Sequence, residues 1–222
     1  MYLQVPGRGR RPDSRLSVER VGILGGSFNP PHLGHLVCAQ EARWQLELDR
    51  VLIVPVGEPP HKRIDDPGRE LRFELCRLAV GSASWLEVSR LEIDRPGPSY
   101  TVDTLRTLHE HAPEDELTFI AGGDMAQSLP NWRDPTAVLR LARLAVAERS
   151  GVARDDVAAR LEPIDPGGRV SYFDMPRLDV SSSGVRRRVA EGRPIHYLVP
   201  EDVANRIAEI GLYGSALRAQ TA

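Results

Sequence analysis

The chain has 222 residues, of which 41% are hydrophobic and 27% are charged, and its formal net charge is −2 at neutral pH. This length and composition predict one globular domain, with or without short additions, around a sizeable core. The nearly balanced charge argues against a broad nucleic-acid-binding surface, so nucleic acid is not expected as a partner. No apolar run approaches the ~20 residues that span a bilayer, so a membrane is not expected either.

Residues 1–20 are polar, contain several arginines and prolines, and have no periodicity. We expect a disordered basic tail there, of a kind that can contact nucleic acid or an acidic partner. A single domain is expected over residues 21–214, followed by a short tail over residues 215–222. Two cysteines without a metal-binding pattern, and no secretory segment near the start, predict a cytoplasmic location.

The first structured stretch is predicted at residues 21–35, VGILGGSFNPPHLGH. Its apolar start, residues 21–24, predicts a buried strand. Gly25 and Gly26 allow a tight turn and a close approach of a ligand to the backbone. A strand, a glycine-rich turn and a helix start form a common phosphate-binding setting, because unpaired backbone N–H groups gather at the amino end of a helix.

Two histidines follow this turn. A helix is expected to begin near Gly34, so His32 and His35, three residues apart, would point the same way. Imidazoles add donors near neutral pH. The stretch is neither the GxGxxG dinucleotide fingerprint nor a Walker loop, which would end in Gly-Lys-Ser/Thr.

Strands and helices then alternate at short loop lengths. Further strands are expected at residues 51–56, 86–93, 117–121, 144–147 and 170–174, and helices at residues 34–48, 69–80, 101–110, 137–141, 180–188 and 201–210, with a short helix within 150–169. Residues 51–56 are apolar throughout, as in a strand buried on both faces of a parallel sheet. The alternation predicts an α/β three-layer sandwich with a mainly parallel central sheet.

Several polar side chains follow predicted strands, where such sheets bind ligands. His61 and Lys62, the only lysine of the chain, follow the second strand, although this could be a solvated basic loop. Asp124 follows the strand at 117–121 and could cap the next helix or hold ligand hydroxyls. Arg149 follows the strand at 144–147.

Two other segments are candidates for ligand contacts. Trp132 lies in a proline-bounded loop, where its ring could belong to the core or stack on a flat ligand. Three serines at 181–183 lead into a helix with arginines at 186–188. A serine-capped helix start suits a phosphate or the edge of a base, but an ordinary capped helix with solvated arginines has the same sequence.

Six ordered segments together resemble the motifs of the bacterial nicotinate-nucleotide adenylyltransferases, in the HxGH nucleotidyltransferase superfamily. They are GGSFNPPHLGH (25–35), PPHK (59–62), PSYTVDTL (98–105), GGDM (122–125), LPNW (129–132) and VSSSGVR (180–186). The resemblance runs from about Val21 to Tyr213. Residues 98–105 and 122–132 favour this family over the pantetheine-phosphate adenylyltransferases and the cytidylyltransferases.

The resemblance implies a Rossmann-like fold and the joining of ATP to nicotinate mononucleotide, with Mg²⁺, to give deamido-NAD and pyrophosphate. The ATP-binding residues it implies are Gly25, Gly26, Ser27, His32, His35, Ser182, Ser183 and Arg186. The residues it implies for the mononucleotide are His61, Lys62, Tyr100, Thr101, Asp124, Trp132 and Arg149. The catalytic group would be His32, His35, Lys62 and Arg186. No metal ligand is expected, because phosphate oxygens and water would hold Mg²⁺.

The chain departs from the family pattern at a few positions. Asn29 stands where many members have Asp, and Ser150 replaces a proline beside Arg149, which weakens that assignment. Arg133 follows Trp132 where an aromatic residue is frequent, so one wall of the pyridine site could differ. Two other interpretations stay open: an adenylyltransferase for another phosphate acceptor such as phosphopantetheine, and a non-catalytic nucleotide-binding protein. A homo-oligomer is compatible with the sequence, which does not determine the oligomeric state.

Overall fold

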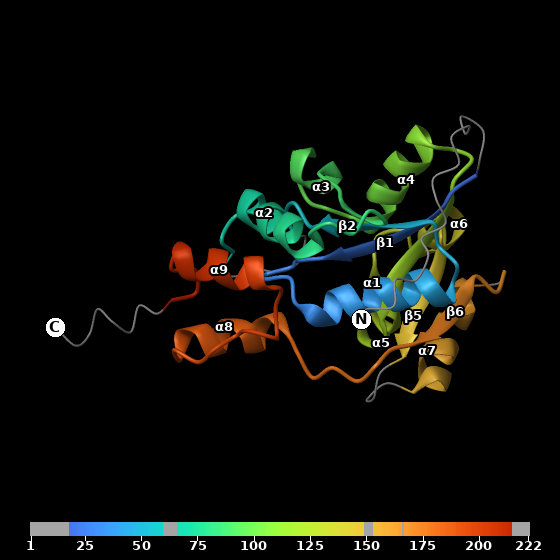
Figure 1. Cartoon of the computed structure of the whole chain (residues 1–222). Helices are drawn as coiled ribbons and strands as arrows, with labels where there is room; N and C mark the ends of the chain where they lie inside the picture. The colour runs from blue at the N-terminus through green and yellow to red at the C-terminus, as the bar shows by residue number, and fades with distance from the viewer. Residues whose placement is uncertain (1–17, 60–65, 149–152, 166, 215–222) are drawn as a thin grey trace.

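The computed structural model describes residues 18–59, 66–148, 153–165 and 167–214 (Figure 1). Three predicted site residues, His61, Lys62 and Arg149, lie outside the described residues, as does Ser150. Of the predicted basic tail, residues 18–20 are described, and Arg20 already belongs to the first strand. Among the described helices, none is long and apolar enough to cross a bilayer.

Within the described residues, six strands form one sheet in the order β3-β2-β1-β4-β5-β6, and every neighbouring pair is parallel. The strands are β1 Arg20–Gly26, β2 Arg50–Pro55, β3 Leu86–Val88, β4 Glu116–Gly122, β5 Arg143–Glu148 and β6 Val170–Asp174. The prediction of a parallel sheet is confirmed.

The helices connect these strands. They are α1 Leu33–Gln45, α2 Arg69–Val80, α3 Leu91–Asp94, α4 Thr101–His111, α5 Gly123–Ser128, α6 Pro135–Leu141, α7 Arg154–Leu161, α8 Ser182–Ala190 and α9 Glu201–Glu209. Short 3₁₀ turns follow α5 and α7, at Leu129–Asn131 and Glu162–Ile164.

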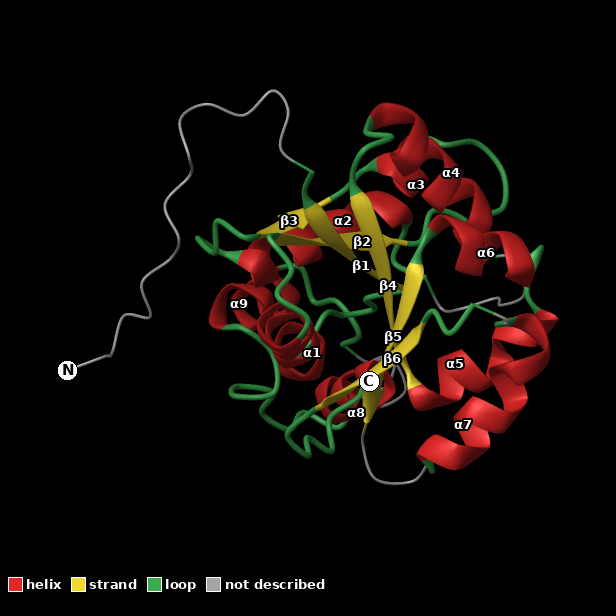
Figure 2. Cartoon of the chain, turned by 90° about the vertical axis from the view of Figure 1, so that its right-hand side faces the viewer, coloured by secondary structure: helices red, strands yellow, loops and turns green. Residues whose placement is uncertain are grey.

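Helices cover both faces of the sheet (Figure 2). On one face, α4 to α7 bury side chains such as Leu105 and Leu139 against the strands. On the other face, α1 and α2 pack through residues such as Ala39 and Cys76. Helices α8 and α9 extend this second layer, since they bury a cluster around Val203 against α2 (Figure 1). The predicted three-layer sandwich is confirmed.

Two predicted elements differ from the structure by three residues or more at one end. The strand predicted at 86–93 was wrong beyond Val88, because the chain turns there: the Leu91 N–H donates to Ser89 Oγ at 3.2 Å, and a helical turn, α3, follows. The alternation reflected burial of Ile93 inside that turn instead of a continuing strand. The helix predicted at 34–48 ends at Gln45, since Glu47 has a left-handed backbone with φ 52°.

The topology places the site at the carboxyl ends of β1 and β4. The chain adds β2 and β3 on one side of β1, then returns to add β4 on its other side. At such a switch point the loops after the two neighbouring strands diverge and leave a crevice for a ligand. The glycine pairs at 25–26 and 122–123 both lie at this edge, since Leu24 pairs with Ile120 in register.

Candidate active site

Two histidines meet where the loop after β1 enters α1. His32 is the N-cap of α1, and His35 lies in the first turn. Their rings are stacked, with centroids 3.7 Å apart and planes 24° apart. The Phe28 ring contacts the His35 ring edge-on, at a centroid distance of 4.9 Å. The predicted common direction of the two imidazoles is thus confirmed.

A hydrogen bond assigns the tautomer of His35. The backbone N–H of His32 donates to His35 Nδ1 at 3.1 Å. Because Nδ1 accepts here, the proton of the neutral ring is on Nε2. The neutral imidazole is therefore a donor through Nε2, which suits a phosphate oxygen.

Gly34 makes room for the His32 ring. A Cβ atom at this position would lie 3.1 Å from two atoms of that ring and 3.1 Å from Val180 Cγ1. These distances are tighter than ordinary van der Waals contacts. At the end of β1, a Cβ atom on Gly26 would similarly lie 3.2 Å from the Phe28 ring, whereas Gly25 has room for one at 3.5 Å from Phe119. The glycines at 26 and 34 are therefore explained by packing.

Helix α8 holds the loop of residues 27–31 (the 27–31 loop) from one side. Arg186 donates through its guanidinium to the Asn29 carbonyl at 2.7 Å. Ser182 Oγ donates to the Pro30 carbonyl at 2.8 Å. Residues 152 to 157 positions apart in the sequence thus meet, and the start of α8 lies beside the start of α1.

The three serines at the start of α8 make different contacts. Ser181 is the N-cap, and its Oγ accepts the Gly184 N–H at 3.1 Å. Ser181 and Ser183 share a hydrogen bond at 3.2 Å between their hydroxyl oxygens. The predicted pair, Ser182 and Ser183, therefore lies in the first helical turn, where backbone N–H groups lack partners within the helix.

Arg72, which the sequence analysis did not single out, holds the 27–31 loop from the opposite side. Its side chain on α2 is fully buried. It donates to the Ser27 carbonyl at 3.2 Å and to the Gly57 carbonyl at 3.1 Å, and pairs with Asp66 at 2.8 Å. One guanidinium therefore joins the loop after β1 to the chain after β2.

Tyr213, near the end of the described chain, also reaches this loop. Its hydroxyl donates to Asn29 Oδ1. Burial raises the pKa of the Tyr213 phenol, so the hydroxyl keeps its proton and remains a donor. The Asn29 amide oxygen thus ties the 27–31 loop to the end of the described chain.

Of the predicted mononucleotide residues, the structure brings the segment of Trp132 close to Tyr100 and Thr101 at the start of α4. Tyr100 is the N-cap of α4, and Thr101 begins that helix. Arg133, directly after Trp132, places its guanidinium 4.7 Å above the Tyr100 ring and pairs with Asp103 at 3.4 Å. The segment carrying Trp132 therefore lies against the start of α4.

Trp132 packs against the core, which was one of the two roles considered for it, and its stacking on a ligand stays a prediction. Its indole N–H donates to Ser128 Oγ at 2.9 Å, and its ring contacts Phe119 edge-on at 5.8 Å. The side chain is half-buried and packs against the core of the sheet. An anchored, half-exposed indole can present one face to a planar ligand.

Asp124 lies exposed in the first turn of α5. The interpretation that it caps this helix was wrong, because Gly122 is the N-cap. A carboxylate in the first turn is still favourable beside the positive end of the helix. Among the described residues, no group of three or more His, Cys, Asp or Glu side chains could hold a metal ion.

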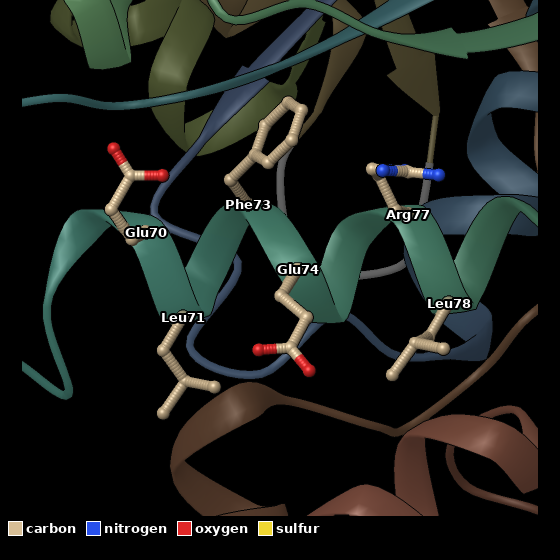
Figure 3. A pocket seen from close by; sticks show the side chains of 6 residues that line it. All are labelled: Glu70, Leu71, Phe73, Glu74, Arg77 and Leu78. Carbon is tan, nitrogen blue, oxygen red and sulfur yellow. The ribbon is translucent and has the colours of Figure 1, made fainter.

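A separate hollow lies along α2 (Figure 3), and neither His32 nor His35 lines it. Its lining residues are Glu70, Leu71, Phe73, Glu74, Arg77 and Leu78. Two of its charges are already paired, Glu70 with Arg90 at 2.9 Å and Glu74 with Arg206 at 2.8 Å. We assign no ligand to it.

Comparison with known proteins identifies the family. The model of the cytidylyltransferase-like family matches residues 23–188. A protein of Roseiflexus sp. named "Probable nicotinate-nucleotide adenylyltransferase" is 46% identical over 202 residues, which cover 89% of this chain and 100% of the relative. A Desulfitobacterium hafniense protein of the same name is 44% identical and covers 88% and 96%. The chain belongs to the nicotinate-nucleotide adenylyltransferase family. It is therefore a nucleotidyltransferase.

A solved structure shares the fold at lower identity. The Plasmodium falciparum nicotinic acid mononucleotide adenylyltransferase complexed with NaAD has a TM-score of 0.72 and 17% sequence identity, over 88% of this chain and 97% of that chain. At this identity the likeness concerns the fold alone. It agrees with the Rossmann-like arrangement predicted from the six motifs of the nicotinate-nucleotide adenylyltransferases.

Proposed function

We propose that the chain transfers the adenylyl group of ATP to the phosphate of nicotinate mononucleotide, releasing pyrophosphate and forming deamido-NAD in NAD biosynthesis. The observation that carries the proposal is the stacked pair His32 and His35, held at the amino end of α1 beyond β1. The switch point of the sheet lies directly beside this pair, and the chain belongs to the nicotinate-nucleotide adenylyltransferase family.

The ATP phosphates would lie at the starts of α1 and α8. Gly25, Gly26 and Ser27 would give the backbone access to them. The imidazoles of His32 and His35 supply donors, and helix starts attract anions. A guanidinium carries five N–H donors, and the contact of Arg186 with Asn29 uses one of its amino groups.

The reaction needs no nucleophile from the protein. The mononucleotide phosphate is already an anion and attacks the α-phosphorus in line with the leaving pyrophosphate. The protein must hold two anions together and stabilise the charge that develops as pyrophosphate departs. Positioning supplies at most about 7–11 kcal/mol, and one well-placed donor supplies about 3–4 kcal/mol. A site of histidines, arginine and backbone N–H groups fits both tasks.

We infer that Mg²⁺ enters as part of MgATP. Mg²⁺ prefers oxygen ligands and keeps several water molecules, so phosphate oxygens and water can hold it. The described residues near the histidines are nitrogen donors and hydroxyls, which suit the phosphates better than the ion itself. Lys62 and His61 remain predicted phosphate contacts and Arg149 a predicted mononucleotide contact, all outside the described residues.

The cytoplasm is the location we propose. The two cysteines, Cys38 and Cys76, are both buried and form no disulfide within the described residues, as expected in a reducing compartment. A homo-oligomeric state remains a prediction.

Replacing Trp132 with alanine is expected to raise KM for nicotinate mononucleotide about tenfold or more, because stacking of an aromatic plate on a base-like ring contributes roughly 1–3 kcal/mol. Tyr100, Thr101 and Asp124 would complete this pocket. Steady-state kinetics at saturating ATP measure the effect, and Trp44→Ala, an exposed tryptophan on α1, is the matched control. An increase confined to KM for ATP would contradict the pocket.

The proposal is tested by pyrophosphate release from MgATP with three acceptors: nicotinate mononucleotide, nicotinamide mononucleotide and phosphopantetheine. We expect fast turnover with the first and much slower turnover with the other two. Fast turnover only with phosphopantetheine would keep the nucleotidyltransferase chemistry and replace the substrate. No turnover with any acceptor would overturn the proposal.

A further inference from the structure

A buried carboxylate lies beside the proposed mononucleotide side of the site and takes no part in the chemistry above. Glu92, in α3, is only 8% exposed. Its Oε1 accepts the Thr104 hydroxyl at 2.6 Å, and the Ser99 hydroxyl also bonds to the carboxyl group. Burial raises the pKa of Glu92, and these two hydrogen bonds oppose the rise. Burying a carboxyl group costs free energy unless its acceptors are used, so its partners matter.

Ser99 links Glu92 to the chain that leaves β2. The Ser99 Oγ accepts the N–H of Gly57 at 3.1 Å and the N–H of Glu58 at 3.4 Å. The Ser99 N–H donates in turn to the Glu58 carbonyl at 2.8 Å. The hydroxyl oxygen thus accepts two N–H groups, and its own proton is left to donate to the Glu92 carboxyl group.

Gly57 lets the chain after β2 approach α3 closely. A Cβ atom at position 57 would lie 2.0 Å from the backbone oxygen of Glu92, so no other residue fits without a shift. The carbonyl of Gly57 accepts the Arg72 guanidinium at 3.1 Å. The peptide groups around Gly57 are therefore held by Ser99 on one side and by Arg72 on the other.

The same network fixes the start of α4. Ser99 immediately precedes Tyr100, whose carbonyl accepts the Thr104 N–H at 3.2 Å. Thr104 is thus bonded both to the N-cap residue of α4 and to Glu92. The Tyr100 ring, below the Arg133 guanidinium, is carried on this fixed turn.

We infer that Glu92 is a positioning residue for the mononucleotide site: through Ser99 and Thr104 it holds the chain after β2 and the start of α4 in one arrangement. The inference rests on the proposed function. It assigns to Glu92 no contact with substrate, and it separates the mononucleotide side from the ATP side. The 27–31 loop is held by Ser182 and Arg186 of α8 and by Arg72 of α2, and it reaches the Glu92 network only indirectly, through the bond of Arg72 to the Gly57 carbonyl.

The test compares KM for each substrate in Glu92→Ala, Glu92→Gln and Ser99→Ala. We expect KM for nicotinate mononucleotide to rise about tenfold in Glu92→Ala, a factor typical of a lost hydrogen bond to a charged group. KM for ATP is expected to stay within about twofold, because a substitution changes binding where its contacts are lost. Glu92→Gln keeps one acceptor oxygen and is expected to rescue part of the loss.

A matched control separates positioning from general destabilisation. Asp115 directly precedes β4, so it lies at the amino end of this strand, opposite the candidate site. Its side chain is 14% exposed, and its Oδ1 accepts the Glu19 N–H at 3.2 Å. Asp115→Ala is expected to lower the unfolding temperature without changing either KM. An equal rise in both KM values for Glu92→Ala, or an unchanged KM for the mononucleotide in a folded variant, would overturn the inference.

Ser99→Ala decides the matter if Glu92→Ala does not fold, since it removes one hydroxyl only. It is expected to raise KM for the mononucleotide and, combined with Glu92→Gln, to give less than the product of the two single effects. An unchanged KM in Ser99→Ala would overturn the inference. The wild-type protein is assayed alongside. If it turns over nicotinate mononucleotide, an unchanged KM in Ser99→Ala counts against the role of Glu92 alone. If it does not, the proposed function fails, and the inference fails with it.

Discussion

Replacing His35 with alanine is expected to lower kcat by about 10²–10³, because removing one preorganised donor to developing charge has an effect of this size. The His35 ring stacks on the ring of His32, and in its neutral form it carries its proton on Nε2. The variant also loses the acceptor for the His32 N–H, a capping bond that contributes about 1 kcal/mol to stability. Initial rates at saturating MgATP and mononucleotide measure the loss, and thermal unfolding monitors the fold.

His109→Ala is the matched control for His35. His109 lies exposed on α4, so its removal is expected to leave kcat unchanged. Near-normal turnover in folded His35→Ala would contradict the assignment of the stacked histidines to the phosphates.

Replacing Arg72 with methionine is expected to reduce the free energy of unfolding by about 3–5 kcal/mol, because two backbone carbonyls lose hydrogen bonds to a charged group that contribute about 1.5–3 kcal/mol each. The substitution leaves Asp66 without its guanidinium and the carbonyls of Ser27 and Gly57 without their donor. Both loops that border the site lose a shared anchor, so activity should fall as well. Urea denaturation measures the change in stability.

Arg77→Met on the same helix is the control, because Arg77 is exposed and such substitutions usually change stability by less than about 0.5 kcal/mol. A change of similar size in the two variants would show that Arg72 does not anchor the loops.

Elements with a strong pattern were predictable from the sequence. Helix α2 has the predicted bounds, Arg69–Val80, because leucines recur on one face between a glycine at each end. The histidine pair was also predictable, since both rings lie within one helical turn. The strand expected at 86–93 was not, because burial of Ile93 in a short helical turn gives the same alternation as a strand.

The anchors of the site were not predictable. Arg72 meets Ser27 across 45 residues of sequence, and Tyr213 meets Asn29 across 184. Neither contact leaves a local pattern in the sequence. Because the chain has many arginines, the sequence does not indicate which of them is buried. Glu92 is similar: only the fold reveals that this carboxylate faces Ser99 and Thr104 instead of solvent.

In the proposed reaction, the adenylyl group of ATP passes directly to nicotinate mononucleotide, without a covalent intermediate on the protein. The most direct test incubates the chain with MgATP labelled in the α-phosphate and with the mononucleotide, then separates products and protein. We expect the label in a dinucleotide with the mass of deamido-NAD, with one pyrophosphate released per product and none of the label on the protein. Label that remains in ATP or AMP, or that becomes bound covalently to the protein, would contradict the account.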